Sequence, residues 1–388
     1  MKSSWPTKKL VEVCDLQRGN EPGSRTYNEE GKGIRFIRVA DISKQRTSPI
    51  WTTGKNLVIC NKNDILMTFD GSPGVVFRGI EGAISSGIRI IKPKNSKELF
   101  DDFLFYVLQT EPVQNTVKKY TIGVSIWHAS KSIPHIEIPL PPLEIQKRIV
   151  ARIEELFAKI DKAKELREKV LEGTKQIFQS ALQEIFSKAE KEYGTVKVSD
   201  VIKKPPQYGY TASATENLIG PKLLRITDIQ NRKVDWDKVP YCKCSDKEFE
   251  KYKLEEDDIL FARTGATTGK TYLITKCPKR AVFGSYLIRI KVNKEKIKPE
   301  YTFEFFQSPQ YWRQIMPYGG AQPNMNARLL SKIKIPLPPL SEQKKIVAYL
   351  DNLREKVEKL KQLQQKQLEE LTELKNSILE KAFKGELI

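Results

Sequence analysis

The chain contains the same segment twice. Residues 136–148 read IEIPLPPLEIQKR, residues 333–345 read IKIPLPPLSEQKK, and the copies lie 197 residues apart in a chain of 388. Each copy is followed by a highly charged stretch with helical spacing. A repeat at half the chain length indicates two related halves, and a chain of this length has room for two or three domains with cores of their own.

Weaker repeats extend this pairing to the rest of the chain. Residues 36–42 (FIRVADI) match residues 223–229 (LLRITDI) at an offset of 187, and the DIL of residues 64–66 recurs at residues 258–260 at an offset of 194. Because the offset grows along the chain, we expect two related domains that share core strands and differ by loop insertions. Loops that differ on a shared scaffold are suited to different specificities.

The local patterns predict a mixture of strands and helices. Short apolar runs at residues 34–39, 64–67 and 88–91 predict strands bounded by turn residues. Residues 100–108 (FDDFLFYVL) predict a helix with Asp101 as its N-cap, and YTFEFF at residues 301–306 occupies the matching place in the second half. The fold class is therefore expected to be multi-domain α+β.

The proline-rich segments predict stiff, extended connectors, because proline cannot continue a helix. Beyond each connector, apolar residues alternate at steps of four and three, which is coiled-coil spacing. About 45 residues at ~1.5 Å each would span roughly 65 Å. The seam expected for the first helix is Ile149, Ile153, Leu156, Ile160, Ala163, Arg167, Val170, Thr174, Ile177 and Ala181. The seam expected for the second is Ile346, Leu350, Leu353, Val357, Leu360, Gln364, Gln367, Leu371, Leu374 and Ile378.

Both seams contain a polar residue at the same place, Arg167 in the first and Gln364 in the second. Such a residue lowers stability and can fix the register of a coiled coil. We expect the two helices to pair with each other in antiparallel orientation, which would bring these two positions near each other. Pairing between two copies of the chain is the alternative.

The positive charge lies mainly outside the two helical stretches. Residues 1–142 carry a net charge of +6 and residues 191–339 carry +11, whereas residues 143–190 and 340–388 carry +1 each. This distribution indicates that the globular parts meet a polyanion, nucleic acid first. Charge that serves only solubility is the alternative.

Other functional classes have weak support in the sequence. Five cysteines and an N-terminus without an apolar signal region predict a cytoplasmic protein, and no apolar run is long enough to cross a membrane. Cys242, Cys244 and Cys277 could suggest a zinc site, but no histidine lies near them in the sequence to complete the set of ligands. Ordinary thiols are therefore the favoured interpretation. Residues 265–271 (GATTGKT) have three residues between the glycines, one fewer than a phosphate-binding loop requires. The Asn/Asp-Pro-Pro-Tyr/Phe signature of an adenine methyltransferase is absent, since Pro205-Pro206 is followed by Gln207.

In this order, the motifs resemble those of the specificity subunit of type I restriction–modification systems. The resemblance depends on the paired PLPPLxxQ segments, the DILxxxxGxxG-like strand and loop in each half, and the AFKGEL of residues 382–387. It implies target-recognition domains at residues 1–142 and 191–339 and spacer helices at residues 143–190 and 340–388. It also implies a pseudo-two-fold arrangement in which the two antiparallel helices separate the domains.

The resemblance further implies a non-catalytic subunit whose partners carry the chemistry. These partners are double-stranded DNA, two methyltransferase subunits along the helices, and restriction or motor subunits in the full complex. S-adenosylmethionine, ATP and Mg²⁺ would belong to those partners, and no cofactor or metal is expected in this chain. The alternatives are the specificity subunit of a fused methyltransferase–nuclease system of type IIB kind, and a basic coiled-coil scaffold without sequence preference.

Candidate DNA contacts are side chains that can bond to base edges or phosphates and that lie in predicted loops. In the first half they are Arg18, Arg25, Arg38, Asp70, Ser72, Arg78, Ser85, Ser86, Ser125, Trp127, His128 and Lys131. In the second half they are Tyr208, Tyr210, Arg225, Arg263, Thr264, Thr267, Thr268, Lys270, Ser285, Tyr286, Gln322, Asn324, Asn326 and Arg328.

Several of these residues have a structural alternative. Arg38 and Arg225 can form ion pairs with Asp41 and Asp228, Trp127 can belong to the core, and the turn containing Thr267 can be purely structural. Because Asp70-Gly-Ser-Pro in one half stands where Arg263-Thr-Gly-Ala stands in the other, the two halves are expected to recognise different sequences.

Overall fold

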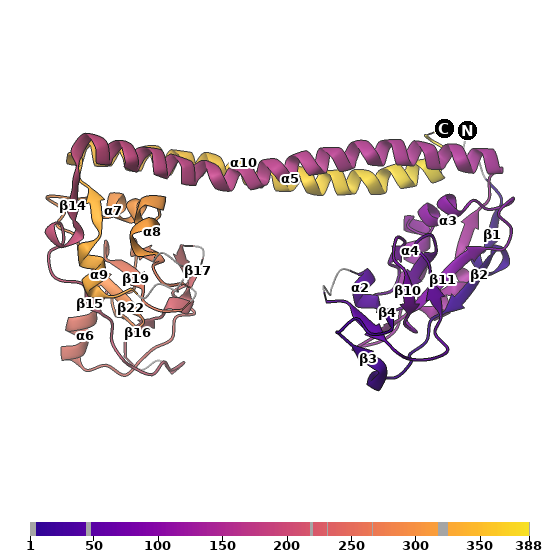
Figure 1. Ribbon diagram of the computed structural model, residues 1–388, viewed down its shortest axis with the longest axis horizontal. Coiled ribbons are helices and arrows are strands. Elements are labelled where there is room, and N and C mark those ends of the chain that lie inside the picture. The colour runs from indigo at the N-terminus through magenta and orange to yellow at the C-terminus, as the bar shows by residue number, and fades with distance from the viewer. Residues whose placement is uncertain are drawn as a thin grey trace. The chain divides into compact units, whose positions relative to one another are not determined.

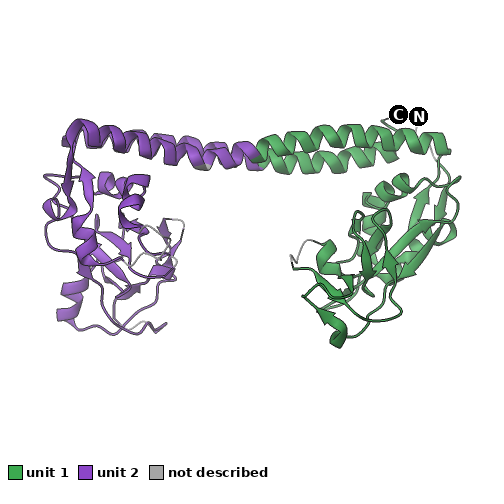
Figure 2. Ribbon diagram, in the orientation of Figure 1, with its two compact units in different colours: residues 1–168, 366–388 green, residues 169–365 purple. Residues whose placement is uncertain are grey.

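The computed structural model describes residues 5–43, 48–217, 220–230, 232–265, 267–316 and 325–387. The chain forms two compact units, shown in Figure 2. Unit 1 comprises residues 1–168 and 366–388, and unit 2 comprises residues 169–365. Each unit therefore combines one globular stretch with parts of both long helices.

Unit 1 is built from short strands and helices (Figure 1). In chain order they are β1 (Thr7–Lys9), α1 (Leu10–Val13), β2 (Cys14–Arg18), η1 (Ser24–Thr26), β3 (Tyr27–Asn28), β4 (Ile34–Ile37), α2 (Val39–Ile42), β5 (Ile50–Thr52), β6 (Ile59–Cys60), β7 (Ile65–Thr68), β8 (Asp70–Gly71), β9 (Val76–Phe77), β10 (Gly82–Ile84), β11 (Ile88–Pro93), α3 (Asp101–Val107), α4 (Glu111–Lys119), β12 (Trp127–His128), η2 (Ser130–His135) and β13 (Glu137–Pro139). The long helix α5 (Leu143–Tyr193) then begins in unit 1 and ends in unit 2.

Unit 2 repeats much of this order. Its elements are β14 (Thr195–Lys197), η3 (Val198–Asp200), β15 (Gln207–Tyr208), β16 (Lys222–Leu224), η4 (Ile226–Asp228), β17 (Ile229–Gln230), β18 (Lys233–Val234), α6 (Asp246–Tyr252), β19 (Ile259–Ala262), β20 (Thr271–Leu273), β21 (Ala281–Phe283), β22 (Leu287–Ile290), α7 (Pro299–Phe305), α8 (Pro309–Ile315), α9 (Ala327–Lys332) and β23 (Lys334–Pro336). The long helix α10 (Leu340–Phe383) returns to unit 1.

The strand pairing confirms the repeated α+β architecture. The main sheet has the order β2-β11-β7-β9 in unit 1 and β15-β22-β19-β20 in unit 2. The parallel pair β4·β10 corresponds to β16·β21, and the antiparallel pair β1·β13 corresponds to β14·β23. The units differ in their second sheets, because β4 and β10 belong to a five-stranded sheet whereas β16 and β21 form a two-stranded one.

Each long helix contributes to the core of both units. In unit 1, Ile149 and Ile153 of α5 and Ala382 of α10 are buried in the same cluster as Phe103 and Leu104 of α3. In unit 2, Phe186 of α5 lies 5.4 Å from Tyr301 and 5.3 Å from Phe305 between ring centroids. Helices α3 and α4 in unit 1, and α7 and α8 in unit 2, lie between the long helices and the main sheet (Figure 1).

The contacts between the long helices show their antiparallel orientation within unit 1. Asp161 bonds to Lys375 at 2.6 Å and Lys164 bonds to Thr372 at 2.8 Å. Further along α5, Arg167 donates to the side chain of Gln367. As the residue numbers rise along α5, those of the partners fall along α10, as the sequence predicts. The seam residue Arg167 thus has Gln367 as a partner.

The predicted seam is correct over much of its length and wrong at Val170, Ile177 and Leu374, whereas Thr174 is buried as predicted. Val170 and Ile177 of α5 are 45% and 44% exposed, and Leu374 of α10 is 45% exposed. A straight α-helix has 3.6 residues per turn, so it drifts by about 20° per heptad away from a 3.5-residue repeat. In unit 2 the buried face of α5 has moved to residues such as Leu182 and Phe186, which meet the aromatic core around α7.

Two local predictions are also wrong. The residue at the N-cap of α3 is Phe100, and Asp101 is the first residue within the helix, where its carboxylate can meet the positive end of the helix dipole. The strand expected at residues 34–39 ends at Ile37, because Val39 begins α2 and the carboxylate of Asp41 caps the backbone N–H of Arg38.

A buried glutamine joins each connector to the helix that packs beneath it. Gln146 accepts a bond from the Phe100 N–H at 2.9 Å and donates to the carbonyls of Glu98 and Pro141 at 2.8 and 2.9 Å. Its equivalent in unit 2, Gln343, accepts from the Lys298 N–H at 2.7 Å and donates to the carbonyls of Lys296 and Pro338 at 3.1 and 2.8 Å. This pair of contacts explains the glutamine of the PLPPLxxQ motif, because it fixes where each long helix begins relative to its own domain.

Candidate nucleic-acid interface

A repeated Gln-x-Gly turn ends the first strand of each main sheet. It reads Gln17-Arg18-Gly19 in unit 1 and Gln207-Tyr208-Gly209 in unit 2. A Cβ on either glycine would lie 2.2 Å from a backbone oxygen, that of Ser85 or of Gly284. The close approach therefore requires glycine. A comparison of the two halves at an offset of 190 could have found this motif, which our sequence analysis missed.

The turn holds Arg18 beside two other predicted residues in unit 1. The Arg18 guanidinium donates from Nε to the Ser86 carbonyl at 3.0 Å, and its Nη2 lies 3.7 Å from Oδ2 of Asp70. Asp70 also bonds to Nδ1 of His128 at 2.8 Å. His128 reaches this point because β12 pairs with β8. Three segments that lie far apart in the sequence thus meet at one surface.

Arg89 is a further member of this cluster that the sequence analysis missed. It pairs with Arg18 across β11 and β2, and its Nη1 donates to the same Ser86 carbonyl at 2.8 Å. Its Nη2 donates to the Ser130 hydroxyl at 3.1 Å. Burial lowers the pKa of the Arg89 guanidinium, and the nearby Arg18 lowers it further. Arg89 itself is buried, so its guanidinium lies beneath the surface and adds to the positive charge there without being exposed.

The equivalent surface of unit 2 carries different side chains. The Arg263 guanidinium lies 4.9 Å from the centroid of the Tyr208 ring, and the Tyr208 hydroxyl accepts a bond from the Ala327 N–H at 3.1 Å. The Arg263 N–H bonds to the carbonyl of Tyr286, whose side chain is 66% exposed. Met325 donates its N–H to the Arg263 carbonyl, just as Ala129 donates to Phe69 in unit 1. Cation, aromatic ring and backbone here form a surface suited to stacking and to contacts with bases or phosphates.

The sequence matches a known family over nearly its whole length. The family model described as the type I restriction modification DNA specificity domain matches residues 2–172 and 179–370. The chain belongs to this family. The specificity subunit of the type I restriction enzyme MjaVIII from Methanocaldococcus jannaschii is 29% identical over 374 residues, which cover 90% of this chain and 83% of that protein. The EcoKI specificity subunit from Escherichia coli K12 is 25% identical over 91% of this chain and 82% of its own length.

Solved structures show the same fold. A chain from a study of complex assembly and conformational transition of the type I restriction–modification system has a TM-score of 0.72 at 22% identity, covering 99% of both chains. The HsdS subunit from Thermoanaerobacter tengcongensis has a TM-score of 0.60 at 21% identity, covering 99% of this chain and 98% of its own. The protein is the DNA specificity subunit of a type I restriction–modification system, with two target-recognition domains, and is itself non-catalytic.

The specificity subunit uses some of the predicted residues in internal contacts. Arg38 and Arg225 form ion pairs with Asp41 at 3.3 Å and Asp228 at 2.8 Å, which is the structural alternative considered above. Arg78 pairs with Asp102 and lies 3.9 Å from the centroid of the Phe105 ring.

The remaining candidates differ in how much of their surface is available. Ser85 and Thr268 are each 5% exposed, and Thr268 donates to the Gly265 carbonyl at 2.7 Å. Asn326 caps α9, because its side chain accepts a bond from the Leu329 N–H at 2.9 Å. Burial raises the pKa of the Tyr210 hydroxyl to about 12. The exposed candidates are Arg25, Ser125, Lys131, Thr264, Lys270 and Arg328, and the half-buried ones are Ser72, Ser86, Thr267 and Ser285. Gln322 and Asn324 lie outside the described residues. Trp127 is 48% exposed, so it is not a core residue.

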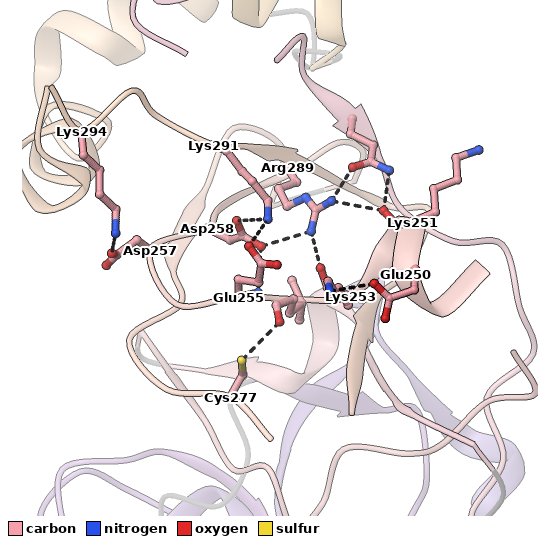
Figure 3. A network of polar contacts seen from close by, with 12 residues as sticks. Glu250, Lys251, Lys253, Glu255, Asp257, Asp258, Cys277, Arg289, Lys291 and Lys294 are labelled. Atoms are coloured by element: carbon pink, nitrogen blue, oxygen red, sulfur yellow. Dashed lines mark hydrogen bonds and ion pairs between the residues drawn. The ribbon is translucent and has the colours of Figure 1, made fainter. Parts of the chain in front are cut away.

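A buried ion pair supports the strand that carries Tyr208. Arg289 of β22 lies 3.1 Å from Oδ2 of Asp258 (Figure 3). It also donates to Gln207, the neighbour of Tyr208. Burial raises the pKa of Asp258, and the Arg289 guanidinium opposes this rise. At the equivalent position of unit 1 the sheet carries Ile90. The same sheet position is thus apolar in one domain and charged in the other.

Metal and membrane sites find no support in the part of the chain that the structure describes. Among those residues there is no group of three or more His, Cys, Asp or Glu side chains that could hold a metal ion. Cys242 packs against Leu223 and Val282, whereas Cys277 borders a separate cluster, and burial raises the pKa of Cys242 to about 11. None of the described helices is long and apolar enough to cross a membrane.

Proposed function

We propose that each unit recognises one half of a bipartite, asymmetric DNA site. The observation that carries this proposal is the pair of equivalent surfaces with different chemistry. Unit 1 presents Arg18, Asp70 and His128, whereas unit 2 presents Tyr208 and Arg263 at the same place on the sheet. An arginine reads guanine well, a carboxylate accepts a bond from cytosine, and an aromatic ring stacks on bases. Different side chains at matched positions favour different half-sites.

The test is to select preferred sequences from a random DNA pool with the specificity subunit bound to its methyltransferase, and to map methylated bases in the host genome. We expect a site with two unlike halves separated by a spacer. We also expect affinity to fall steeply with salt, because phosphate contacts release counterions. A perfectly palindromic site would contradict the proposal of unlike halves, and binding without sequence preference would favour a simple scaffold.

We propose in addition that α5 and α10 set the spacing of the half-sites and dock two methyltransferase subunits. Their nearly neutral charge, against the basic globular stretches, supports a protein contact over a DNA contact. In the full complex, restriction or motor subunits would join, and S-adenosylmethionine, ATP and Mg²⁺ would bind to these partners. All five cysteines are free thiols, which is consistent with the cytoplasmic location of such a complex. Reconstitution of methylation from the separate subunits tests this assignment.

A further inference from the structure

An apolar hairpin projects beside the candidate interface of unit 1. Within residues 122–127, Val124 is 96% exposed, Ile126 is 57% exposed and Ile122 is 54% exposed. Large apolar side chains grouped in this way on a surface mark a contact with a partner. None of the contacts described above uses these three side chains.

The hairpin is built to present them. Reciprocal backbone bonds of 2.9 and 2.7 Å between Ile122 and His128 close it at its base. Gly123 has a φ of +134°, and a Cβ there would lie 2.0 Å from the Ile126 carbonyl oxygen. Trp127 lines a groove of about 470 Å³ together with Val117 and Lys118, and its backbone pairs with Gly71 of β8, which ties the hairpin to its own domain. The fold therefore holds the exposed tip in a defined conformation.

The surroundings of the tip indicate what it meets. Strand β12 at the end of the hairpin pairs with β8, which carries Asp70, so the tip is continuous with the Arg18 cluster. The exposed side chains of Lys118 and Lys119 precede the hairpin, and the exposed Lys131 follows it. A surface of apolar side chains flanked by lysines is better suited to bind DNA than to bind a neutral protein.

In the major groove of DNA, the base feature that favours an apolar contact is the 5-methyl group of thymine. We propose that hairpin 122–128 enters the major groove of the half-site read by unit 1, and that Val124 and Ile126 contact thymine methyl groups. This inference rests on the proposed function and adds to it a specificity determinant that acts without hydrogen bonds.

The test replaces each thymine of the unit 1 half-site by deoxyuridine, which lacks only the methyl group. Affinity is measured with the specificity subunit bound to its methyltransferase, once that half-site has been identified. We expect a loss of about fourfold for each contacted methyl, the factor for removing one buried methyl-sized group. The doubly substituted chain Val124→Ser, Ile126→Ser should bind the normal duplex more weakly and should no longer distinguish thymine from deoxyuridine.

Two controls make the result specific. The substitutions Ile34→Ser and Ile59→Ser remove apolar side chains that are 43% and 50% exposed elsewhere in the globular part of unit 1, and they should leave the discrimination intact. Deoxyuridine in the half-site read by unit 2 should give the same ratio for the wild-type chain and for the Val124, Ile126 variant.

Three outcomes would overturn the inference while leaving the proposed function in place. They are a unit 1 half-site without thymine, specific binding that is insensitive to deoxyuridine there, and a hairpin variant that keeps the discrimination. A hairpin variant that fails to bind the methyltransferase in the absence of DNA would show a protein contact at the tip instead. Absence of any sequence preference in the wild-type complex would contradict the proposed function itself, and this inference with it.

Discussion

Lys375 of α10 holds its ammonium group 4.7 Å from the centroid of the Phe157 ring on α5. The arrangement is the same in unit 2, where Arg354 of α10 lies 4.8 Å from the centroid of the Phe178 ring on α5. The offset of 197 maps Phe157 onto Arg354 and Phe178 onto Lys375. Pairing of α5 with α10 therefore places a cation on a ring in both units. Antiparallel pairing of α10 with a second α10 in the same register would place Arg354 against Lys375, which disfavours association between copies.

Replacing Phe178 by lysine should test this arrangement. The change removes a packed ring and places a like charge beside Arg354, so we expect unfolding to become easier by about 3 kcal/mol. The matched control is Ile177→Lys, one residue away and 44% exposed, which should change stability by less than about 0.5 kcal/mol. Chemical denaturation measures both. Equal effects at the two positions would show that the cation–ring contact has no stabilising role.

The buried glutamines allow a second prediction. Gln146→Ala would leave the Phe100 N–H and two carbonyl groups without their bonds, at a cost of about 1–3 kcal/mol for each group that water does not reach. We expect a total loss of about 3 kcal/mol and faster hydrogen exchange at the Phe100 amide. Gln183→Ala on the exposed face of α5 is the control. A Gln146→Ala chain with wild-type stability and unchanged exchange would contradict the role of this residue as a structural link.

The sequence predicts the long helices and the glutamine motif, but not all of their contacts. The repeat of PLPPLxxQ is visible in the sequence, but the partners of Gln146 are backbone groups around Phe100, and backbone partners leave no sequence signal. The heptad pattern predicts antiparallel helices correctly, but it places Val170 and Ile177 in the seam although both are exposed. The actual buried face of α5 depends on tertiary packing against the core around α7, which periodicity cannot reveal.

The candidate interface shows the same limit. Arg18, Asp70 and His128 could be selected by residue type, whereas their meeting at one point depends on the pairing of β8 with β12. Arg89 was missed because an arginine inside an apolar strand pattern reads as an outward-facing residue. The apolar hairpin was missed because exposure of Val124 and Ile126 cannot be deduced from a short apolar run.

Arg18→Ala and Arg263→Ala should each affect one half-site only. Loss of a base-reading arginine costs about 1–3 kcal/mol and relaxes preference at the contacted position, whereas loss of a phosphate contact weakens binding to all sequences alike. Selection from a random DNA pool should therefore show relaxed preference in the first half-site for one variant and in the second for the other. Arg280→Ala, whose side chain is 56% exposed in unit 2 outside the candidate interface, is the control. Relaxation of both halves by either variant would contradict independent reading by the two domains.

Arg289→Ala should destabilise unit 2 by about 3 kcal/mol, because it removes the guanidinium from the buried Asp258 and leaves only Lys291, at 3.5 Å, as its cationic partner. Burial already raises the pKa of Asp258, and removal of Arg289 should raise it further. A raised folded-state pKa means that the folded variant binds a proton more readily than the unfolded chain does. The deficit should therefore be greatest at neutral pH and should shrink as the pH falls toward about 4, the ordinary range of the group. Unfolding measured across this pH range provides the check.

The control for this prediction is Lys294→Ala. Lys294 pairs with Asp257 at the surface, and its side chain is 55% exposed. Such a pair contributes about 0–1 kcal/mol, so its loss should be small and nearly independent of pH. A deficit in the Arg289 variant that stays constant down to pH 4 would show that the charge of Asp258 is not the source of the instability.

Lengthening both long helices should lengthen the DNA spacer. Four residues inserted between Glu168 and Lys169 of α5, together with four between Gln365 and Lys366 of α10, add about 6 Å to each helix at the boundary between the two units. At ~3.4 Å per base pair, we expect the preferred spacer to grow by about two base pairs while both half-sites stay the same. An insertion in α5 alone should break the register of the pair and weaken methyltransferase docking without defining a new spacer. Selected sites with the original spacer from the doubly lengthened chain would show that the helices do not set the distance.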